Sequence, residues 1–155
     1  MEEMTAYHSR GKIVRVEADG TSYQTNPGAD NSTWTTKVSK DNKPLADTRR
    51  DAKGNILCTI EYYDANEKKT KIKTLYINGK QDHTFWYDEN GTVTKRRNHI
   101  SGNTVTFRDL PDGSYISERK PDKGQVSYTR NFKDDSWYKC DKDGKMLPGE
   151  TLYKK

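Results

Sequence analysis

The chain has 155 residues, a length that fits one domain, and it is 30% hydrophobic and 33% charged. Its 28 basic and 23 acidic residues leave a net charge of only +5, and it carries ten tyrosines, three tryptophans and three phenylalanines. Mixed charge and many aromatics argue against a disordered chain, and no apolar run approaches membrane-spanning length. We expect an ordered protein with a thin hydrophobic core.

Cysteine content and the N-terminus bear on where the protein is found. There are two cysteines, Cys58 and Cys140, whereas a small secreted scaffold held by disulfides usually carries more. A single bridge between them stays open. Residues Met1–Met4 lack the basic and apolar regions of a signal peptide. We expect a cytoplasmic protein, one secreted without a conventional signal peptide, or a mature fragment, and no membrane partner.

Pairs of turn-forming residues recur along the whole chain at steps of 9 to 13 residues. Asp-Gly and Asn-Gly favour tight hairpins because both positions of a two-residue turn need positive φ. In chain order the pairs are Asp19-Gly20, Asp30-Asn31, Asp41-Asn42, Lys53-Gly54, Asn66-Glu67, Asn78-Gly79, Asn90-Gly91, Ser101-Gly102, Asp112-Gly113, Lys123-Gly124, Asp134-Asp135 and Asp143-Gly144. A constant spacing of this kind indicates a repeat architecture of roughly eleven residues per strand.

The segments between these pairs have the alternation of β-strands. Residues 55–63 place Ile56, Cys58, Ile60 and Tyr62 on one face, and residues 69–74 alternate lysine with Thr and Ile. The sequence therefore predicts an all-β fold, an antiparallel meander of about ten to thirteen short strands joined by tight turns. We expect one domain over residues 1–155, clearest over 50–145, as an extended, twisted and partly single-layer sheet or an open barrel.

A modest core is expected on apolar residues of these segments. Its predicted members are Val14, Val16, Trp34, Val38, Ile56, Ile60, Tyr62, Val105, Phe107, Val126, Tyr128 and Phe132.

Three short motifs resemble known families of β-hairpin repeats. Residues 87–94 (YDENGTVT) resemble the Tyr-Asp (YD) repeats of Rhs-type bacterial proteins, which build β-sheet shells around toxin cargo. Residues 75–80 (LYINGK) are similar to the variant MORN repeats of antitoxin-like bacterial proteins, and residues 110–115 (LPDGSY) resemble Pro-Asp-Gly turns of centrosomal proteins. The chain departs from these patterns in lacking a regular Gly-x-Gly spacing. The resemblance implies an architecture and assigns no binding residue.

No residue constellation predicts an enzyme, a metal site or a cofactor site. His8, His83 and His99 are too scattered for a metal motif. Cys58 lies on the most apolar strand face, which suits a small buried side chain, and Cys140 is close to acidic residues that disfavour a thiolate. Many aspartates fall at turns, where they bond to the backbone. A carboxylate pair assembled only by the fold stays a minor alternative.

Basic residues alternate with aromatics in the central segments. Lys69, Lys71 and Lys73 are expected to share one face, and Lys95, Arg96 and Arg97 follow on a later strand. Such a basic face beside aromatic residues could bind single-stranded nucleic acid through phosphate contacts and base stacking. Charged residues also keep an exposed sheet soluble, so this is an alternative partner.

The favoured function is a non-catalytic protein-interaction or scaffold module. A broad sheet with exposed aromatics suits recognition of another protein, with an immunity or antitoxin-like protein of bacterial type as the concrete version. Its expected anchors are Trp34, Trp86, Tyr87, Trp137 and Tyr138. A fragment of a larger Tyr-Asp-repeat toxin shell is the other alternative.

Overall fold

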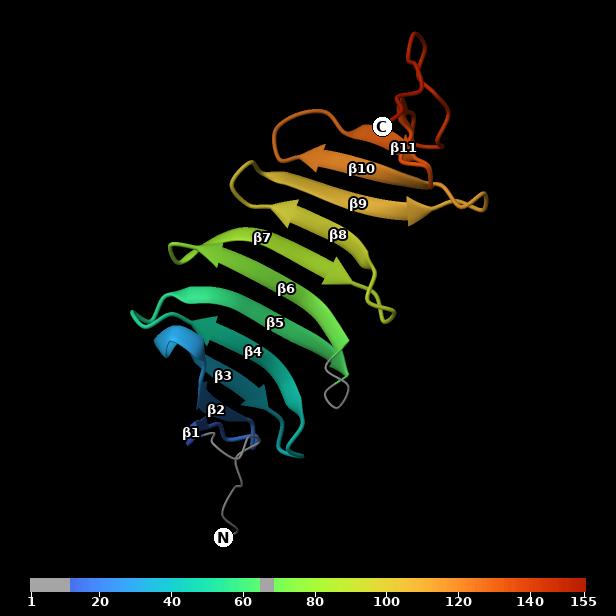
Figure 1. Ribbon diagram of the computed structural model, residues 1–155. Helices are drawn as coiled ribbons and strands as arrows, with labels where there is room; N and C mark the ends of the chain where they lie inside the picture. The colour runs from blue at the N-terminus through green and yellow to red at the C-terminus, as the bar shows by residue number, and fades with distance from the viewer. Residues whose placement is uncertain (1–11, 65–68) are drawn as a thin grey trace. The chain divides into compact units, whose positions relative to one another are not determined.

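The computed structural model describes residues 12–64 and 69–155 as an antiparallel β-meander (Figure 1). The strands are β1 (Lys12–Val16), β2 (Ser22–Pro27), β3 (Thr33–Val38), β4 (Pro44–Arg50), β5 (Ile56–Asp64), β6 (Lys69–Ile77), β7 (Lys80–Tyr87), β8 (Val93–Asn98), β9 (Asn103–Asp109), β10 (Tyr115–Pro121), β11 (Ser127–Asn131) and β12 (Trp137–Cys140). Their order in the sheet is their order in the chain, β1 to β12, so the sheet is not closed on itself. The predicted all-β meander is confirmed, and helix within the described ranges is limited to a short 3₁₀ turn, Ala29–Asn31.

The chain forms two compact units, Met1–Thr92 and Val93–Lys155. The first contains β1 to β7, and the second contains β8 to β12 together with the C-terminal tail. Each is considered separately below.

The predicted turn positions are confirmed by the backbone. Of the twelve predicted pairs, Asn66-Glu67 lies outside the described residues, and in each of the other eleven the second residue has positive φ. These φ values run from 61° at Asn31 to 146° at Gly124. The side chains that tolerate this region, glycine above all and then Asn and Asp, are the ones found there.

The class of turn differs from the two-residue hairpin that was expected. Asn78-Gly79 is such a turn, with both φ values positive between the paired Ile77 and Lys80. Most others are three-residue loops between two flanking strand residues, which gives five residues in all. The N–H of the first of the five donates to the carbonyl of the fifth, and the carbonyl of the first accepts the N–H of the fourth. Two right-handed residues followed by one left-handed residue match the strand twist, so one positive φ suffices. These loops are Glu17–Thr21, Ser39–Lys43, Asp51–Asn55, Asp88–Thr92, Leu110–Ser114, Phe132–Ser136 and Asp141–Lys145.

The repeating element is a pair of strands. In the first unit turns begin at Glu17 and Ser39, and in the second unit at Leu110 and Phe132, and within each unit these starts are 22 residues apart. Successive turns of a meander lie at opposite ends of the strands, so those 22 residues apart lie at the same end. The eleven-residue spacing in the sequence is half of this two-strand repeat.

The interior of the first unit contains polar side chains that are joined by hydrogen bonds. Gln24 and Thr36 are 1% and 2% exposed and face each other across β2 and β3, and Thr36 faces Asp47 on β4. Asp47 accepts hydrogen bonds from the Thr36 hydroxyl at 2.6 Å and from the Tyr62 hydroxyl. Buried polar groups are stable when paired in this way, which lets a chain with few apolar residues form an interior.

The expected apolar core is only partly formed. Val38 is buried, whereas Val14, Val16 and Val126 are 56%, 50% and 39% exposed, so their placement in the core was wrong. Val14 lies at a register shift in β1, Val16 ends that strand, and Val126 precedes the start of β11. The other predicted members are half-buried: Trp34, Ile56, Ile60, Tyr62, Val105, Phe107, Tyr128 and Phe132.

Both cysteines are free and buried. Cys58 belongs to the first unit and Cys140, with Ile116, to the small core of the second. Burial raises the pKa of both thiols. This agrees with the expected burial of Cys58 and with the expectation that the surroundings of Cys140 disfavour a thiolate.

Candidate functional site

The turn Leu110–Ser114 carries a carboxylate fixed by its own backbone. Gly113 donates its N–H to the Leu110 carbonyl at 3.1 Å, and Asp112 Oδ1 accepts the Ser114 N–H at 2.9 Å and the Ser114 hydroxyl. Aspartate at this position therefore stabilises the loop through a local hydrogen bond. Ser114 is 2% exposed, so its hydroxyl faces the interior of the second unit.

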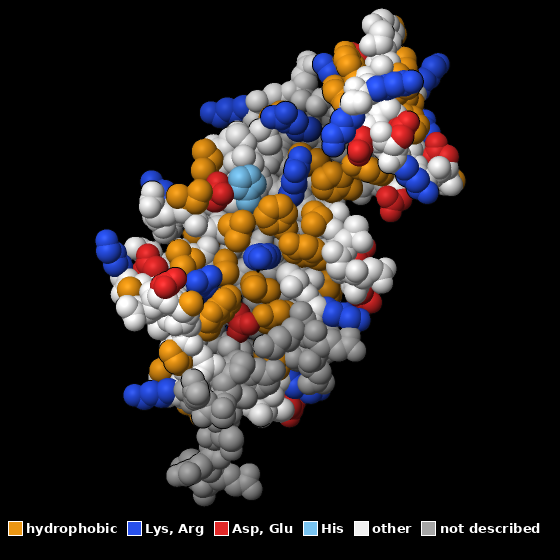
Figure 2. All heavy atoms as spheres, in the orientation of Figure 1, with side chains coloured by type: hydrophobic (Ala, Val, Ile, Leu, Met, Phe, Trp, Pro, Cys, Tyr) orange, Lys and Arg blue, Asp and Glu red, His pale blue; other side chains and the backbone are white. Residues whose placement is uncertain are grey.

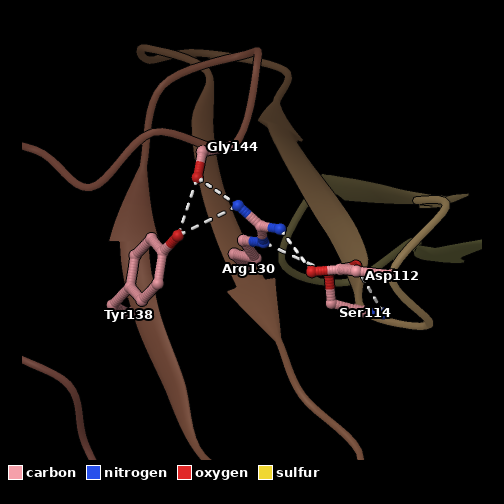
Figure 3. A network of polar contacts seen from close by, with 5 residues as sticks. All are labelled: Asp112, Ser114, Arg130, Tyr138 and Gly144. Carbon is pink, nitrogen blue, oxygen red and sulfur yellow. Dashed lines mark hydrogen bonds and ion pairs between the residues drawn. The ribbon is translucent and has the colours of Figure 1, made fainter.

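Arg130 of β11 binds this turn and joins it to the end of the chain (Figure 3). Its NH2 donates to Asp112 Oδ2 at 2.7 Å and its Nε donates to the Ser114 hydroxyl at 3.1 Å. On the other side, NH1 donates to the Tyr138 hydroxyl and to the Gly144 carbonyl, both at 3.2 Å. The guanidinium thus uses all three of its nitrogens, as its planar donor geometry permits.

The same contacts set the ionisation of Asp112. Hydrogen bonds from the Ser114 hydroxyl and amide, with a further contribution from Arg130, lower the pKa of Asp112 to about 2. The carboxylate is therefore charged at neutral pH and is held as an acceptor.

The next turn of the repeat, Phe132–Ser136, has the same backbone and no arginine. Asp135 donates its N–H to the Phe132 carbonyl at 3.0 Å, and Asp134 Oδ1 accepts the Ser136 N–H at 3.0 Å and the Ser136 hydroxyl. Ser136 is 4% exposed. The residue 22 positions after Arg130 is Leu152, which cannot donate a hydrogen bond.

A pocket of about 460 Å³ lies between these two turns and the tail. We call it the terminal pocket. Polar side chains of the two turns form one side, and Phe132, Tyr138, Met146 and Leu152 provide the apolar walls. The Phe132 and Tyr138 rings lie 5.6 Å apart at 45°. The remaining lining residues are Asp112, Gly113, Ser114, Lys133, Asp134 and Ser136.

Apolar side chains of the tail and of β12 remain exposed beside this pocket. Trp137 and Tyr153 stack with ring centroids 4.4 Å apart, although they are 36% and 42% exposed. Their backbones also pair, with N–H to carbonyl distances of 2.9 and 2.8 Å. We call the following set the terminal apolar surface: Trp137, Met146, Leu147, Leu152 and Tyr153, each 36–43% exposed.

The first unit has a pocket of about 350 Å³ with a different character. Lys69, Lys73 and Tyr87 line it together with Ile60, Thr70 and the turn residues 88–91, which include Asp88 and Glu89. Hydrophobic side chains with scattered basic ones cover the face of β5 to β7 seen in Figure 2. The pocket combines lysines and carboxylates and is therefore electrostatically mixed.

The five predicted aromatic anchors are divided between the two units. In the first, Trp34 is half-buried with the Arg49 guanidinium 5.7 Å from its ring, Trp86 is half-buried opposite Ile72, and Tyr87 lines the mixed pocket. In the second, Tyr138 lines the terminal pocket and Trp137 belongs to the terminal apolar surface. Neighbours in one strand point to opposite faces, so Trp137 and Tyr138 flank β12.

Two of the three predicted basic residues of the first unit, Lys69 and Lys73, line the mixed pocket together, next to irregular strand pairing. Lys73 lies opposite Ile60 and Phe85, whereas the Lys71 ammonium lies 5.7 Å from the Tyr63 ring. Two register shifts interrupt the β5–β6 pairing next to Lys69, so the simple alternation that groups these lysines on one face does not hold there.

The basic residues of the second unit are divided between two faces. Lys95 and Arg97 point to one face of β8 and Arg96 points to the other, where its guanidinium lies 5.9 Å from the Phe107 ring. Arg97 is paired with Asp122 through two hydrogen bonds of 3.0 and 2.7 Å.

Among the residues with described positions, no group of three or more His, Cys, Asp or Glu is arranged to hold a metal ion. Within the same ranges, no helix combines the length and apolar character needed to span a membrane.

Sequence reasoning missed the Asp112–Ser114–Arg130 network and the apolar wall residues Met146 and Leu152. The signal that could have located them is a second period. An aspartate two residues before Ser or Thr occurs at Asp19, Asp30, Asp82, Asp112 and Asp134, and a cation follows 18 residues later only at Asp19 and Asp112.

Comparisons with known proteins leave the family open. No family model matches the sequence, and no curated protein matches it. Among solved structures, one similar chain belongs to the "Crystal structure of GtfA/B complex bound to UDP and GlcNAc", with a TM-score of 0.43 and 14% identity. The match covers 76% of this chain and 23% of that one, so this chain spans about a quarter of the other's length. A similarity of this size carries no argument about function.

Proposed function

We propose that this chain is a non-catalytic protein-interaction module whose contact site is the C-terminal end of the second unit. The supporting observation is the terminal apolar surface, in which five large side chains within 17 residues (137–153) each stay 36–43% exposed. Exposed apolar side chains concentrated in one place are typical of protein contact sites, whereas scattered single ones are not.

The surroundings of this surface fit the anatomy of a protein interface. The Trp137–Tyr153 pair is held by ring stacking and by two backbone hydrogen bonds, so little side-chain entropy is lost on binding. Met146 and Leu152 of this surface also line the terminal pocket, where charged residues such as Lys133 and Asp134 supply a polar rim. Trp137 and Tyr153 lie on the other face of β12 from Tyr138. Large aromatic residues such as Trp137 and Tyr153 are often the energetic centres of such contacts.

A comparative pull-down from native lysate tests the proposal. The whole chain is compared with Trp137→Ala combined with Tyr153→Ala, and with Lys139→Ala as a control, because Lys139 is exposed on the same strand and lies outside the apolar set. We expect the wild type and the control to retain one stoichiometric protein that the double variant loses. Equal retention by all three forms, or retention by none, would contradict an interaction site at this end.

Binding of single-stranded nucleic acid is a weaker candidate, supported by the mixed pocket of the first unit. Lys69, Lys73 and Tyr87 supply two cations and an aromatic ring, but Asp88 and Glu89 line the same pocket and repel phosphate. An oligonucleotide titration at several salt concentrations separates the two candidates, because phosphate binding weakens steeply with salt. Absence of binding at low salt would remove this candidate.

A further inference from the structure

Three described turns share one arrangement around an aspartate at the third position of the loop. In each, the carboxylate accepts the N–H of the residue two positions later, from Thr21 to Asp19, from Ser114 to Asp112 and from Ser136 to Asp134. One carboxylate oxygen is used by the turn itself, so the other oxygen is left to interact with a side chain on the second strand after the turn.

In two of the three turns a cation lies 18 residues after the aspartate, on the second strand after the turn. Arg130, 18 residues after Asp112, bonds to Asp112 Oδ2. Lys37, 18 residues after Asp19, adds its charge to the hydrogen bonds from Thr21 that lower the pKa of Asp19. Only the Arg130 side chain makes a direct hydrogen bond and ion pair with its aspartate among the described residues.

The third turn has the same backbone neighbours and a leucine in place of the cation. Arg130 lies opposite Ile116 in the β10–β11 pairing. The antiparallel bridge between Trp137 and Tyr153 places Leu152 opposite Tyr138 in the same way, 22 residues further on. Leu152 thus occupies the position that a cation fills elsewhere, and it is one of the residues that line the terminal pocket.

The carboxylate of this turn keeps one oxygen available. Within the described part of the chain, Asp134 bonds only to Ser136, through Oδ1, and has no ion pair within 4 Å. Lys154 adds its charge to the hydrogen bonds from Ser136 that lower the pKa of Asp134, but no lysine forms an ion pair with this carboxylate in the described residues. Lys155 Nζ lies 3.9 Å from Asp135, and the Lys133 side chain lies over Gly113.

The walls of the terminal pocket suit a planar cation. We call Leu110–Ser114, which is bound by Arg130, the occupied turn, and Phe132–Ser136 the vacant turn. Leu110 and Ile116 lie at the occupied turn, and the repeat places Phe132 and Tyr138 at the corresponding positions of the vacant turn. Aromatic rings attract a guanidinium through cation–π contact, and its flat shape allows it to stack while it donates hydrogen bonds in its own plane. A lysine ammonium offers no such plane.

We propose that the terminal pocket binds the guanidinium group of an arginine side chain presented by a partner protein. The arginine takes the place that Arg130 has in the preceding turn, donating to Asp134 Oδ2 and to the Ser136 hydroxyl, with Phe132 and Tyr138 beside it. This assignment rests on the proposed interaction function and specifies the chemistry of the partner at one point.

Titration of the whole ¹⁵N-labelled chain with N-acetyl-arginine amide, followed by NMR, tests the site directly. We expect saturable shifts confined to the residues around the pocket, with a Kd of about 1–10 mM, a range typical of one side chain without its partner protein. N-acetyl-citrulline amide has nearly the same shape without the charge, and it should bind about tenfold more weakly or worse. Equal shifts with the two amides, or arginine shifts mainly elsewhere, would overturn the assignment.

Three variants sharpen the test. Asp134→Asn keeps an oxygen for the Ser136 N–H and removes the charge, so arginine binding should weaken about fivefold or more. Asp135→Asn changes the adjacent exposed aspartate and should leave binding within about twofold. Leu152→Arg should abolish binding of the added amide because the chain then fills its own pocket. Unchanged binding in Leu152→Arg would also overturn the assignment.

The pull-down distinguishes this inference from the proposed function. If a partner is retained and Asp134→Asn does not weaken its retention, the interaction module stands and the arginine site is wrong. If the arginine amide binds as described but no partner depends on Trp137 and Tyr153, the site stands and the proposed interaction surface is wrong.

Discussion

The turns Leu110–Ser114 and Phe132–Ser136 show how one local structure takes on two different roles. Both close with the same backbone hydrogen bonds, and both fix an aspartate by the amide two residues later. The first is bound by Arg130, and the second faces a pocket with Leu152 at the corresponding position. Local sequence therefore determines the turn, and a residue 18 positions away determines whether the turn is closed.

The largest change in stability is expected when the contacts of Arg130 with the occupied turn are removed. Arg130→Met keeps the aliphatic stem and removes hydrogen bonds to Asp112, Ser114, Tyr138 and Gly144. Because the Ser114 hydroxyl is buried and these bonds involve a charged donor, we expect a loss of about 2 kcal/mol in the free energy of unfolding. Urea unfolding measures it. A loss within experimental error of zero would show that the arginine does not hold the turn.

Acid should destabilise the occupied turn by protonating Asp112, and the Asp112→Asn substitution should remove this part of the acid sensitivity. The folded pKa of Asp112 is about 2, below its unfolded value of about 3.9, so its contribution is complete above the unfolded value. It is lost as the pH falls from about 4 through 2. The decrease in Tm between pH 6 and pH 2 should be smaller for Asp112→Asn than for the wild type. An identical fall would contradict the stated cause.

Closing the vacant turn should stabilise the protein. Leu152→Arg places a guanidinium opposite Tyr138 and near Asp134, where we expect a gain of about 1 kcal/mol, less than Arg130 provides because the site is more exposed. The matched control is Leu147→Arg, which introduces the same charge on the exposed tail away from the pocket lining. Equal changes in Tm for the two variants would indicate a general charge effect instead of a repeat-specific one.

The smallest expected effect concerns the left-handed residue of each turn. Gly113 has φ of 86°, and its counterpart Asp135 has φ of 66°. Asp135→Gly should stabilise the chain by about 0.5 kcal/mol, because a side chain is disfavoured in this region. Gly113→Asn should have the opposite sign. Thermal unfolding of both variants checks the pair, and matching signs would be inconsistent with this backbone explanation.

Much of the fold could be predicted because its determinants are local. Positive φ is a property of single residues, so Gly20, Gly54 and Asn78 mark their turns without reference to the rest of the chain. The core could not be located in this way. Val14 fits a strand pattern, but a register shift in β1 leaves it exposed, and such shifts depend on the partner strand.

The candidate site was harder to predict because it depends on strand pairing. Trp137 and Tyr138 were selected as aromatics, yet their positions on opposite faces of β12 and beside the terminal pocket follow from the register. Lys95, Arg96 and Arg97 were grouped by adjacency, although strand alternation separates them. Arg130 has no distinctive neighbours in the sequence, and its role emerges only from a contact 18 residues back.

A crystal structure of the Leu152→Arg variant tests the relation between the two turns most directly. The repeat predicts the introduced guanidinium within hydrogen-bond distance of Asp134 and Ser136, beside the Phe132 and Tyr138 rings, as Arg130 lies in the preceding turn. An introduced side chain that extends into solvent, with the pocket unchanged, would contradict the idea that the vacant turn is an arginine site.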